Sequence, residues 1–301
     1  MKFKKAPLIF NEYHDDLVTR TWLLHNLEKL GYECFCFEYD GKVSLDEYIN
    51  ITKNNIENIK VSADPKYVEE IIEERKRTEL LKLLNAGTQP NLQTTNTKQL
   101  VEMAEKQFSK KQVQKCILQD AEYIKKEMAK IAKMLPEYEL LLAILEKVKS
   151  LNMKYIGIDS NYADQRDVEH ALKSNFSTKN SERDPVIAQR IAVTAKMYEG
   201  SIICLIGVGH LLGVTKHLVE KFATLPLLKP YQSNIENFKF IRIFDRNFEY
   251  DSSREEEIEK ESIQLKNKFN WFNVETVLYQ GPDTTILEDL TSNVSQPLLH
   301  L

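Results

Sequence analysis

The feature that most constrains the fold is a short apolar run followed by a helical segment and then by a second apolar run. All three lie in the stretch "LIFNEYHDDLVTRTWLLHNLEKLGYECFCFEYDG" (8–41). Leu8–Tyr13 and Cys34–Tyr39 have the length and apolar character of buried strands. Between them, Asp15–Leu30 has apolar residues at helical spacing, and Gly31 follows its end. Two strands joined through a helix form a βαβ unit, which predicts a parallel sheet.

The same alternation of apolar runs and helical segments continues along the chain. We expect an α/β fold with a mainly parallel central sheet flanked by helices, and with a helical insertion. Phe238–Asp245 is expected as a strand or an amphipathic edge strand. The other expected strands are Met153–Asp159, Ser201–Gly207 and Val274–Tyr279. The other expected helices are Leu45–Ile59, Lys66–Leu84, Gln99–Lys133, Glu137–Lys149, Val186–Tyr198, Leu211–Phe222 and Ser253–Phe269.

The expected domain organisation places the insertion within the α/β core. Residues 1–59 and 151–230 form the two parts of the core, 60–150 the helical insertion, and 231–301 a C-terminal α/β extension. Inside the insertion, Asn85–Lys98 has no apolar periodicity. That composition predicts a mobile loop or local disorder.

Composition and charge argue against several classes of function. The chain has 301 residues, of which 42% are hydrophobic and 29% charged, so it can bury a core and remain soluble. A net charge of −4 with mixed signs argues against nucleic acid or an anionic membrane as a partner. No apolar stretch reaches the roughly 18 residues of a membrane span, and the N-terminal apolar run is too short for a signal peptide. We expect the four cysteines to be reduced and the protein to be cytoplasmic, which is compatible with secretion by a specialised system.

Ionisable side chains follow the predicted strands at the points where the strands end. Glu12 and His14 end the first strand, Glu38 the second and Asp159 the third, and His210 follows the fourth. Parallel strands bring their carboxyl ends to one edge of the sheet, where ligands bind in open α/β folds. We therefore expect the imidazoles of His14 and His210 to lie within roughly 8 Å of each other, close enough to share a water, metal or substrate group.

The spacing of these residues suits catalysis. Glu12 and His14 are two residues apart, so an extended backbone directs both to the same side. A carboxylate beside an imidazole raises its basicity and fixes its tautomer, which suits a general base or a metal ligand. Gly207 and Gly209 permit a tight turn and a close approach of a ligand to the backbone. His210 is expected at a helix N-terminus, which favours an anion or oxyanion.

Two segments resemble a known family. The segment "SERDPVIAQRIAVTAKMYEGSIICLIGVGHLLGV" (181–214) resembles the TraB proteins, in which an E-R-D helix start precedes an apolar strand and a G-x-G-H turn. "FNEYHDD", followed by "FEY", resembles the opening of the ChaN-like and erythromycin-esterase-like proteins. All of these belong to the Tiki/TraB superfamily. The resemblance covers Leu8–Gly41 and Tyr155–Leu218.

The resemblance implies several functions rather than one. Tiki proteins are metal-dependent proteases, and their ligands carried over to this chain would be His14, His210 and either Glu12 or Glu38. The erythromycin esterases use a histidine base, here His14, supported by glutamates. ChaN-type members bind haem, and other relatives are signalling or toxin modules. Asn11 stands where the family usually has glycine.

Three of the strand-end residues also have a structural interpretation. Glu12 could form an ion pair with Arg20, and Glu38 could cap the following turn. Asp159 begins "DSN", which is typical of a turn or cap.

The segment before the fourth strand has two interpretations as well. Arg183 and Asp184 could be a local ion pair at a helix start, with Asp184 as the N-cap and Pro185 at the first helical position. The family pattern instead makes Arg183 a residue that binds a substrate anion or belongs to a polar network. Together with Asp159, Gly207 and Gly209, it is then a candidate substrate-binding residue.

The leading hypothesis is a hydrolase that acts on an ester or amide bond of a small molecule or peptide. His14 would activate water, Glu12 would orient His14, and His210 would bind a metal or stabilise the developing oxyanion. The resemblance implies one divalent metal, such as Mn²⁺, Co²⁺ or Zn²⁺, with haem as the alternative. A second hypothesis is a non-catalytic ligand or haem binder, with Tyr13 and Tyr39 as candidate haem ligands. A third is a host-directed effector or signalling module whose helical insertion binds a protein partner.

Overall fold

The computed structural model describes residues 1–13, 17–84, 92, 95–159, 176–246, 248 and 252–281. The chain divides into two compact units, one formed by Met1–Asn50 with Leu140–Leu301 and the other by Ile51–Glu139. The chain passes from the first unit to the second within helix α2 (Leu45–Ala63) and returns within α6 (Leu135–Ser150). The second unit thus covers most of the expected insertion, 60–150.

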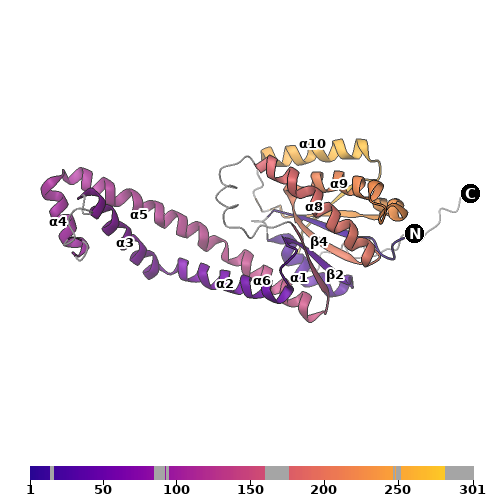
Figure 1. Ribbon diagram of the computed structural model, residues 1–301, viewed down its shortest axis with the longest axis horizontal. Helices are drawn as coiled ribbons and strands as arrows, with labels where there is room; N and C mark the ends of the chain where they lie inside the picture. Colours follow the sequence, from indigo (N-terminus) through magenta and orange to yellow (C-terminus); the bar gives the residue numbers. More distant parts are fainter. Residues whose placement is uncertain are drawn as a thin grey trace, which may run out of the picture. The chain divides into compact units, whose positions relative to one another are not determined.

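The first unit is built on a six-stranded sheet in which every paired strand is parallel to its neighbour (Figure 1). This confirms the predicted α/β fold with a parallel sheet. The strand order is β3-β2-β4-β1-β5-β6. β5 is an inner strand with buried residues on both faces, and β6 is the last strand in the order. The bounds are β1 (Leu8–Glu12), β2 (Cys34–Asp40), β3 (Lys154–Asp159), β4 (Ile202–Gly207), β5 (Lys239–Phe244) and β6 (Val274–Leu278).

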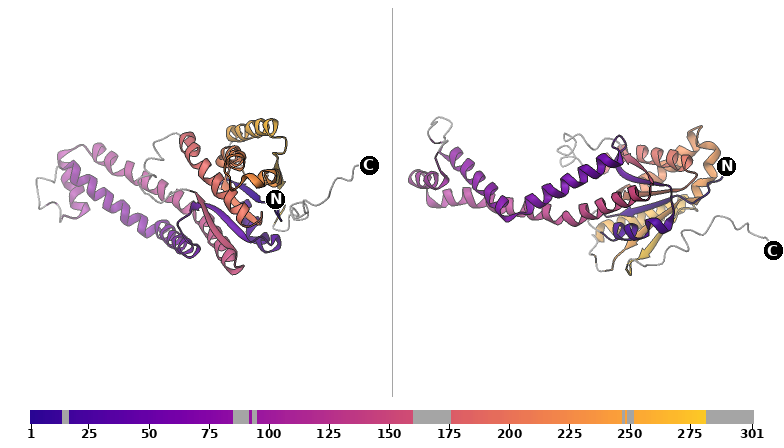
Figure 2. Two further views of the ribbon diagram at one scale, coloured as in Figure 1. Left: turned by 45° about the vertical axis from the view of Figure 1, so that its right-hand side comes forward. Right: turned by 90° about the horizontal axis from the view of Figure 1, so that it is seen from below.

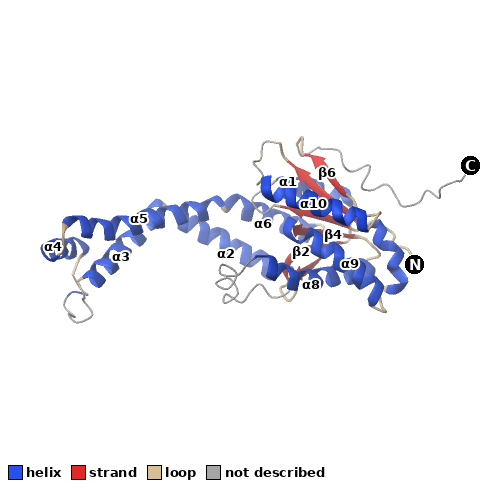
Figure 3. Ribbon diagram, turned by 90° about the horizontal axis from the view of Figure 1, so that it is seen from above, coloured by secondary structure: helices blue, strands red, loops and turns tan. Residues whose placement is uncertain are grey.

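Helices cover both faces of this sheet (Figure 3). One face packs against α1 (Val18–Leu30) and the C-terminal part of α6. The other packs against α8 (Phe176–Met197) and α9 (Leu211–Thr224), with Leu265 of α10 (Ser252–Lys268) packed at its border. Two short 3-10 helices, η3 (Val208–His210) and η4 (Lys229–Asn237), flank α9 in the chain.

Alternation along the strands decides which side chains reach which face. In β2, Cys34 and Cys36 lie in the core beneath α8 and α9, whereas Phe35 and Phe37 lie in the core beneath α1 and α6. This period of two follows from the pleat of a strand. The next residue in the first series is Glu38, so its position on the α8–α9 face is set by the same pattern.

The described part of the second unit is formed by helices (Figure 2). It has a small core of its own. Its remaining helices are α3 (Pro65–Leu83), α4 (Thr97–Gln107) and α5 (Lys110–Lys133). The single helix expected over Gln99–Lys133 is therefore two helices. The division falls at Ser109, which caps α5 in a reciprocal pair with Gln112 and so starts a new helix. The buried residues of this core are Leu80, Leu84, Leu92, Leu100, Ala104 and Val113.

The loop expected over Asn85–Lys98 falls largely outside the described residues. Within it, Leu92 is 7% exposed and belongs to the core of the second unit. Asn96 caps α4, whose first residue is Thr97. At the described positions, one buried apolar residue and one capping residue anchor the segment, and the expected mobile loop or local disorder stays a prediction.

Helix α8 begins earlier than the sequence pattern suggested. It starts at Phe176 rather than Val186, so Asp184 is not its N-cap and Pro185 lies inside the helix. Proline has no N–H to donate to the preceding turn. The carboxylate that was expected to cap the helix is used elsewhere, as the site below shows.

Three cysteines are free buried thiols: Cys34, Cys36 and Cys204. Sγ of Cys34 lies 3.9 Å from Sγ of Cys36, and this hydrogen bond together with burial raises the pKa of Cys34. Cys34 and Cys36 stay protonated, and all three cysteines belong to the core on the α8–α9 face. Over the part of the chain that is described, no helix is both long and apolar enough to cross a membrane.

Candidate functional site

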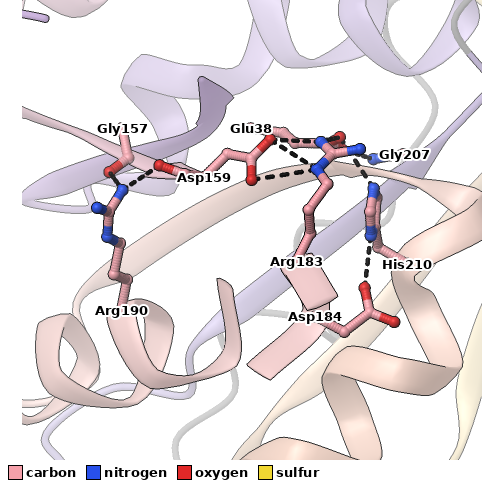
Figure 4. Close-up of polar contacts among 8 residues, drawn as sticks. All are labelled: Glu38, Gly157, Asp159, Arg183, Asp184, Arg190, Gly207 and His210. Atoms are coloured by element: carbon pink, nitrogen blue, oxygen red, sulfur yellow. Dashed lines mark hydrogen bonds and ion pairs between the residues drawn. The ribbon is translucent and has the colours of Figure 1, made fainter. Parts of the chain in front are cut away.

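Glu38 lies near the end of β2, and its carboxylate is the centre of a polar network (Figure 4). Oε2 accepts a hydrogen bond from the backbone N–H of Gly207 at 2.7 Å. Oε1 lies 3.0 Å from Nε2 of His210 and 2.5 Å from Nη2 of Arg183. The Glu38 side chain is 9% exposed. One buried carboxylate thus joins the ends of two adjacent strands to helix α8.

His210 is held between two carboxylates. It ends η3, directly after β4, and is 4% exposed. Its Nδ1 lies 2.5 Å from Oδ1 of Asp184, while Nε2 faces Glu38. Gly213 makes room for this contact, because a Cβ at that position would collide with the carboxylate of Asp184. The sequence "HLLG" therefore places histidine and glycine one helical turn apart with a clear physical reason.

Arg183 links the third strand to the same network. Its Nε donates to the two carboxylate oxygens of Asp159 at 3.0 and 3.2 Å, and its Nη2 donates to Asp159 and Glu38. Arg190 lies about two turns further along α8. It donates to the backbone carbonyls of Gly157 and Asp159. The end of β3 is thus fixed by two arginines of one helix.

The electrostatics of the network favour the charged forms of both Glu38 and His210. Burial alone would raise the pKa of Glu38, but the His210 hydrogen bond and charge, the Arg183 charge and the Gly207 N–H lower that pKa to about 2. Burial alone would lower the pKa of His210, but hydrogen bonds to Asp184 and Glu38 raise that pKa to about 9. At neutral pH His210 is therefore an imidazolium.

Glu12 lies on the opposite face of the sheet. It follows Leu8 and Phe10, which belong to the core beneath α1 and α6, and it is 2% exposed. Nε of Arg20 donates to its Oε2 at 2.9 Å and Nη2 to its Oε1 at 2.7 Å. The ion pair with Arg20, which was one of the two interpretations of Glu12, is present. The structure does not bring Glu12 into contact with Glu38.

The expected convergence of His14 with His210 concerns a residue outside the described range. The neighbouring Tyr13 is described, and its hydroxyl donates to Glu255 of α10. Arg242 of β5 also donates to Glu255, at 2.6 Å, and its guanidinium lies 5.2 Å from the Tyr13 ring centre. Tyr13 is thus held by residues of α10 and β5.

Asn11 replaces the glycine of the resembling family and is 1% exposed. Its Nδ2 lies 3.4 Å from the carbonyl of Ile9 and 3.5 Å from that of Ile241. Within the described part of the chain, its buried Oδ1 has no hydrogen-bond partner. The position therefore accommodates the Asn11 side chain, but it leaves one buried oxygen without a hydrogen bond to any residue that the structure describes, which is unfavourable.

The two glycines expected near the site differ in role. Gly207 supplies the backbone N–H that binds Glu38. Gly209 lies in η3 and is exposed, and it is not among the network drawn in Figure 4. Of the candidate substrate-binding residues, Arg183, Asp159 and Gly207 are therefore in the network.

The donor set does not fit a metal centre. Both ring nitrogens of His210 face carboxylates, so each would have to leave its partner to bind a metal. Among the described residues, no three or more His, Cys, Asp or Glu side chains are arranged to hold a metal ion. The candidate haem ligands have partners too, since Tyr13 binds Glu255 and the Tyr39 ring stacks on Tyr48 with centres 3.8 Å apart.

Sequence reasoning missed the partners that hold the network together. The sequence pattern predicts Asp184 as a helix cap and assigns no role to Arg190 or Gly213. The available signal for Asp184 was its place beside Arg183 on the helix that precedes β4. Its partner His210 is 26 residues away in the chain, so local spacing does not indicate the pairing. Gly213, one turn after His210, was the local signal that a side chain, here that of Asp184, packs closely against α9.

Comparisons with known proteins add no further assignment. No family model, no curated protein and no solved structure matches this chain. The Tiki/TraB resemblance therefore stays a prediction that depends on the motifs quoted above.

Proposed function

We propose that this protein is a hydrolase of an ester or amide bond, with its site at the carboxyl ends of β3, β2 and β4. The observation that carries the proposal is the linked set Asp159, Glu38 and His210, one from each strand end, joined by Arg183. Ligands bind at this edge in open parallel sheets. Charged groups with shifted pKa values in such a place are typical of functional sites.

In this proposal His210 and Arg183 stabilise the negative charge that develops on the carbonyl oxygen. His210 keeps its proton at neutral pH because its pKa is about 9, so it donates a hydrogen bond rather than accepting a proton. Both cations converge on Oε1 of Glu38. An oxyanion that displaced Oε1 of Glu38 would meet the same two donors. Donors directed at a developing oxyanion lower the barrier of acyl transfer.

The water that attacks the carbonyl needs a base. We assign this role to His14, which follows the end of β1 by two residues in the sequence. The assignment requires the chain to leave the extended course of β1 after Tyr13, because Glu12 faces the other side of the sheet. Water adds to the carbonyl carbon, its proton passes to His14 and then to the leaving oxygen or nitrogen, and the C–O or C–N bond breaks. The products are a carboxylic acid and an alcohol or amine. Glu12, which is paired with Arg20, precedes His14 by two residues in the chain.

A panel of p-nitrophenyl esters, anilides and fluorogenic peptides tests the proposal. We expect wild type to hydrolyse at least one class, and His210→Gln to lower kcat by about 10² to 10³, as loss of an oxyanion donor does. The matched control is His217→Gln, because His217 lies seven residues further along α9 and pairs with Glu220. Equal activity in wild type and His210→Gln would contradict the proposed role of His210 as an oxyanion donor.

A second candidate is a non-catalytic ligand-binding protein. The observation that favours it is that both ring nitrogens of His210 and the Arg183 guanidinium are already bound to carboxylates. Such a closed network holds three strand ends in place without any chemistry. Absence of hydrolysis across the whole panel, with a stable folded protein, would favour this candidate.

A further inference from the structure

A pocket of about 330 Å³ lies between α10 and strands β5 and β6. One part of its lining is apolar and comes from Leu211, Phe272 and Val274. All three belong to the core on the α8–α9 face or pack against it, so the pocket opens on the face that carries Glu38 and His210. Its volume is at the lower end of the range for ligand sites, roughly 300 to 1,000 Å³.

The other part of the lining carries charges of both signs. Arg242 and Lys266 are basic, and Glu255 and Glu259 are acidic. Arg242 is held firmly, since it donates to Glu255 at 2.6 Å and lies 5.2 and 5.8 Å from the ring centres of Tyr13 and Phe244. A pocket with an apolar side and balanced charge suits an uncharged apolar group attached to a polar chain better than an isolated anion.

The position of the pocket relates it to the proposed site. Leu211 directly follows His210, and Glu255 binds Tyr13, which directly precedes His14. In the sheet, β1 separates β4 from β5. Two strand spacings of about 4.8 Å separate β4 from β5, a distance of roughly 10 Å that an extended chain spans in about three residues.

We propose that this pocket is a subsite that binds an apolar side chain of an extended, peptide-like substrate, about three residues from the bond that is cleaved. The inference rests on the proposed hydrolase function and narrows its substrate class. A small ester that reaches His210 is too short to reach the part of the lining formed by β5 and β6 as well, because β1 lies between β4 and β5. An extended chain can do both.

The test uses a positional-scanning library of fluorogenic octapeptides on the full chain. Ser262→Trp fills the pocket and Val274→Ala enlarges it, since both residues line it. Gln264→Trp is the control, because it adds the same side chain to an exposed position of α10 that does not line the pocket. Circular dichroism checks that each variant is folded.

We expect wild type to prefer leucine or phenylalanine at one position about three residues from the cleaved bond. Ser262→Trp should lower kcat/KM for that peptide by about tenfold or more, a typical penalty for a blocked apolar pocket. Val274→Ala should shift the preference to a larger side chain, and Gln264→Trp should change neither. Cleavage without such a preference, or equal effects of the two tryptophan variants, would overturn the subsite.

Binding of the same peptides, measured by fluorescence polarisation with His210→Gln protein, separates the two proposals. If wild type cleaves nothing but Ser262→Trp still abolishes peptide binding, the hydrolase proposal fails and the subsite stands. If peptides bind equally to the Ser262→Trp and Gln264→Trp proteins, the subsite is wrong whatever the enzyme does.

Discussion

Nε2 of His210 lies 3.0 Å from Oε1 of Glu38, although the two residues are far apart in the chain. The pairing exists because β2 and β4 are neighbours in the sheet and both end at the same edge. The other ring nitrogen of His210 faces Asp184. An imidazole placed in this way keeps its proton at neutral pH and works as a donor.

Replacing Asp184 with Asn should lower the pKa of His210 toward its ordinary value. The substitution keeps the shape of the side chain but removes one of the two carboxylates that hold the proton on the ring. We also expect a loss of about 1 to 3 kcal/mol in the free energy of unfolding, the usual cost of weakening a buried charged hydrogen bond.

An NMR pH titration of the histidine side chains measures the first effect, and urea unfolding the second. The signals of His217, which pairs with Glu220, serve as the internal reference. An unchanged His210 titration in Asp184→Asn would show that Asp184 does not hold the proton.

Gly213→Ala should also weaken the contact between Asp184 and His210 and destabilise the protein. The added Cβ would occupy the space of the Asp184 carboxylate, so Asp184 must move away from His210. Overpacking of this kind costs about 1 to 3 kcal/mol, whereas an ordinary helical Gly→Ala change stabilises. Lys216→Ala, on the same helix, is the control. A stabilised Gly213→Ala protein would contradict the close packing of Asp184.

The network predicts how stability depends on pH. The pKa of His210 is raised to about 9 from 6.5, so its contribution is complete below about pH 6.5 and is lost as the pH rises through 9. The pKa of Glu38 is lowered to about 2 from 4.5, so its contribution is complete above about pH 4.5 and is lost as the pH falls through 2. Both contributions are complete between pH 4.5 and 6.5.

Urea unfolding from pH 3 to 10 measures this dependence. We expect His210→Gln to be less stable than wild type at pH 6, with a difference that narrows toward pH 10. A difference that stays constant across that range would mean that His210 does not titrate as described.

Arg20→Met should destabilise the protein without changing the site. It removes the cation that pairs with the buried Glu12 carboxylate, which costs about 3 to 5 kcal/mol. Glu12 lies on the α1 face of the sheet, so the titration of His210 should stay the same. The double variant Glu12→Gln/Arg20→Met should recover part of the stability. A shifted His210 titration in Arg20→Met would show that the two faces are coupled.

The strand pattern predicted much of this architecture, because apolar runs of five or six residues separated by helices leave few alternatives to a parallel sheet. It also predicted that Glu38, Asp159 and His210 would lie at one edge. It could not predict that Glu12 faces the other side, since the strand pattern does not say which face of β1 corresponds to which face of β2. The pairing of Asp184 with His210 depends on how α8 lies against α9, which local spacing does not encode.

The pH dependence of hydrolysis tests the central claim most directly. On the best substrate of the panel, we expect kcat/KM of wild type to fall as the pH rises through about 9, because His210 then loses the proton with which it binds the oxyanion. His210→Gln should lack this alkaline limb and should be slower at neutral pH. An alkaline limb that persists in His210→Gln, or wild-type activity that does not fall through pH 9, would contradict the proposed role of the network.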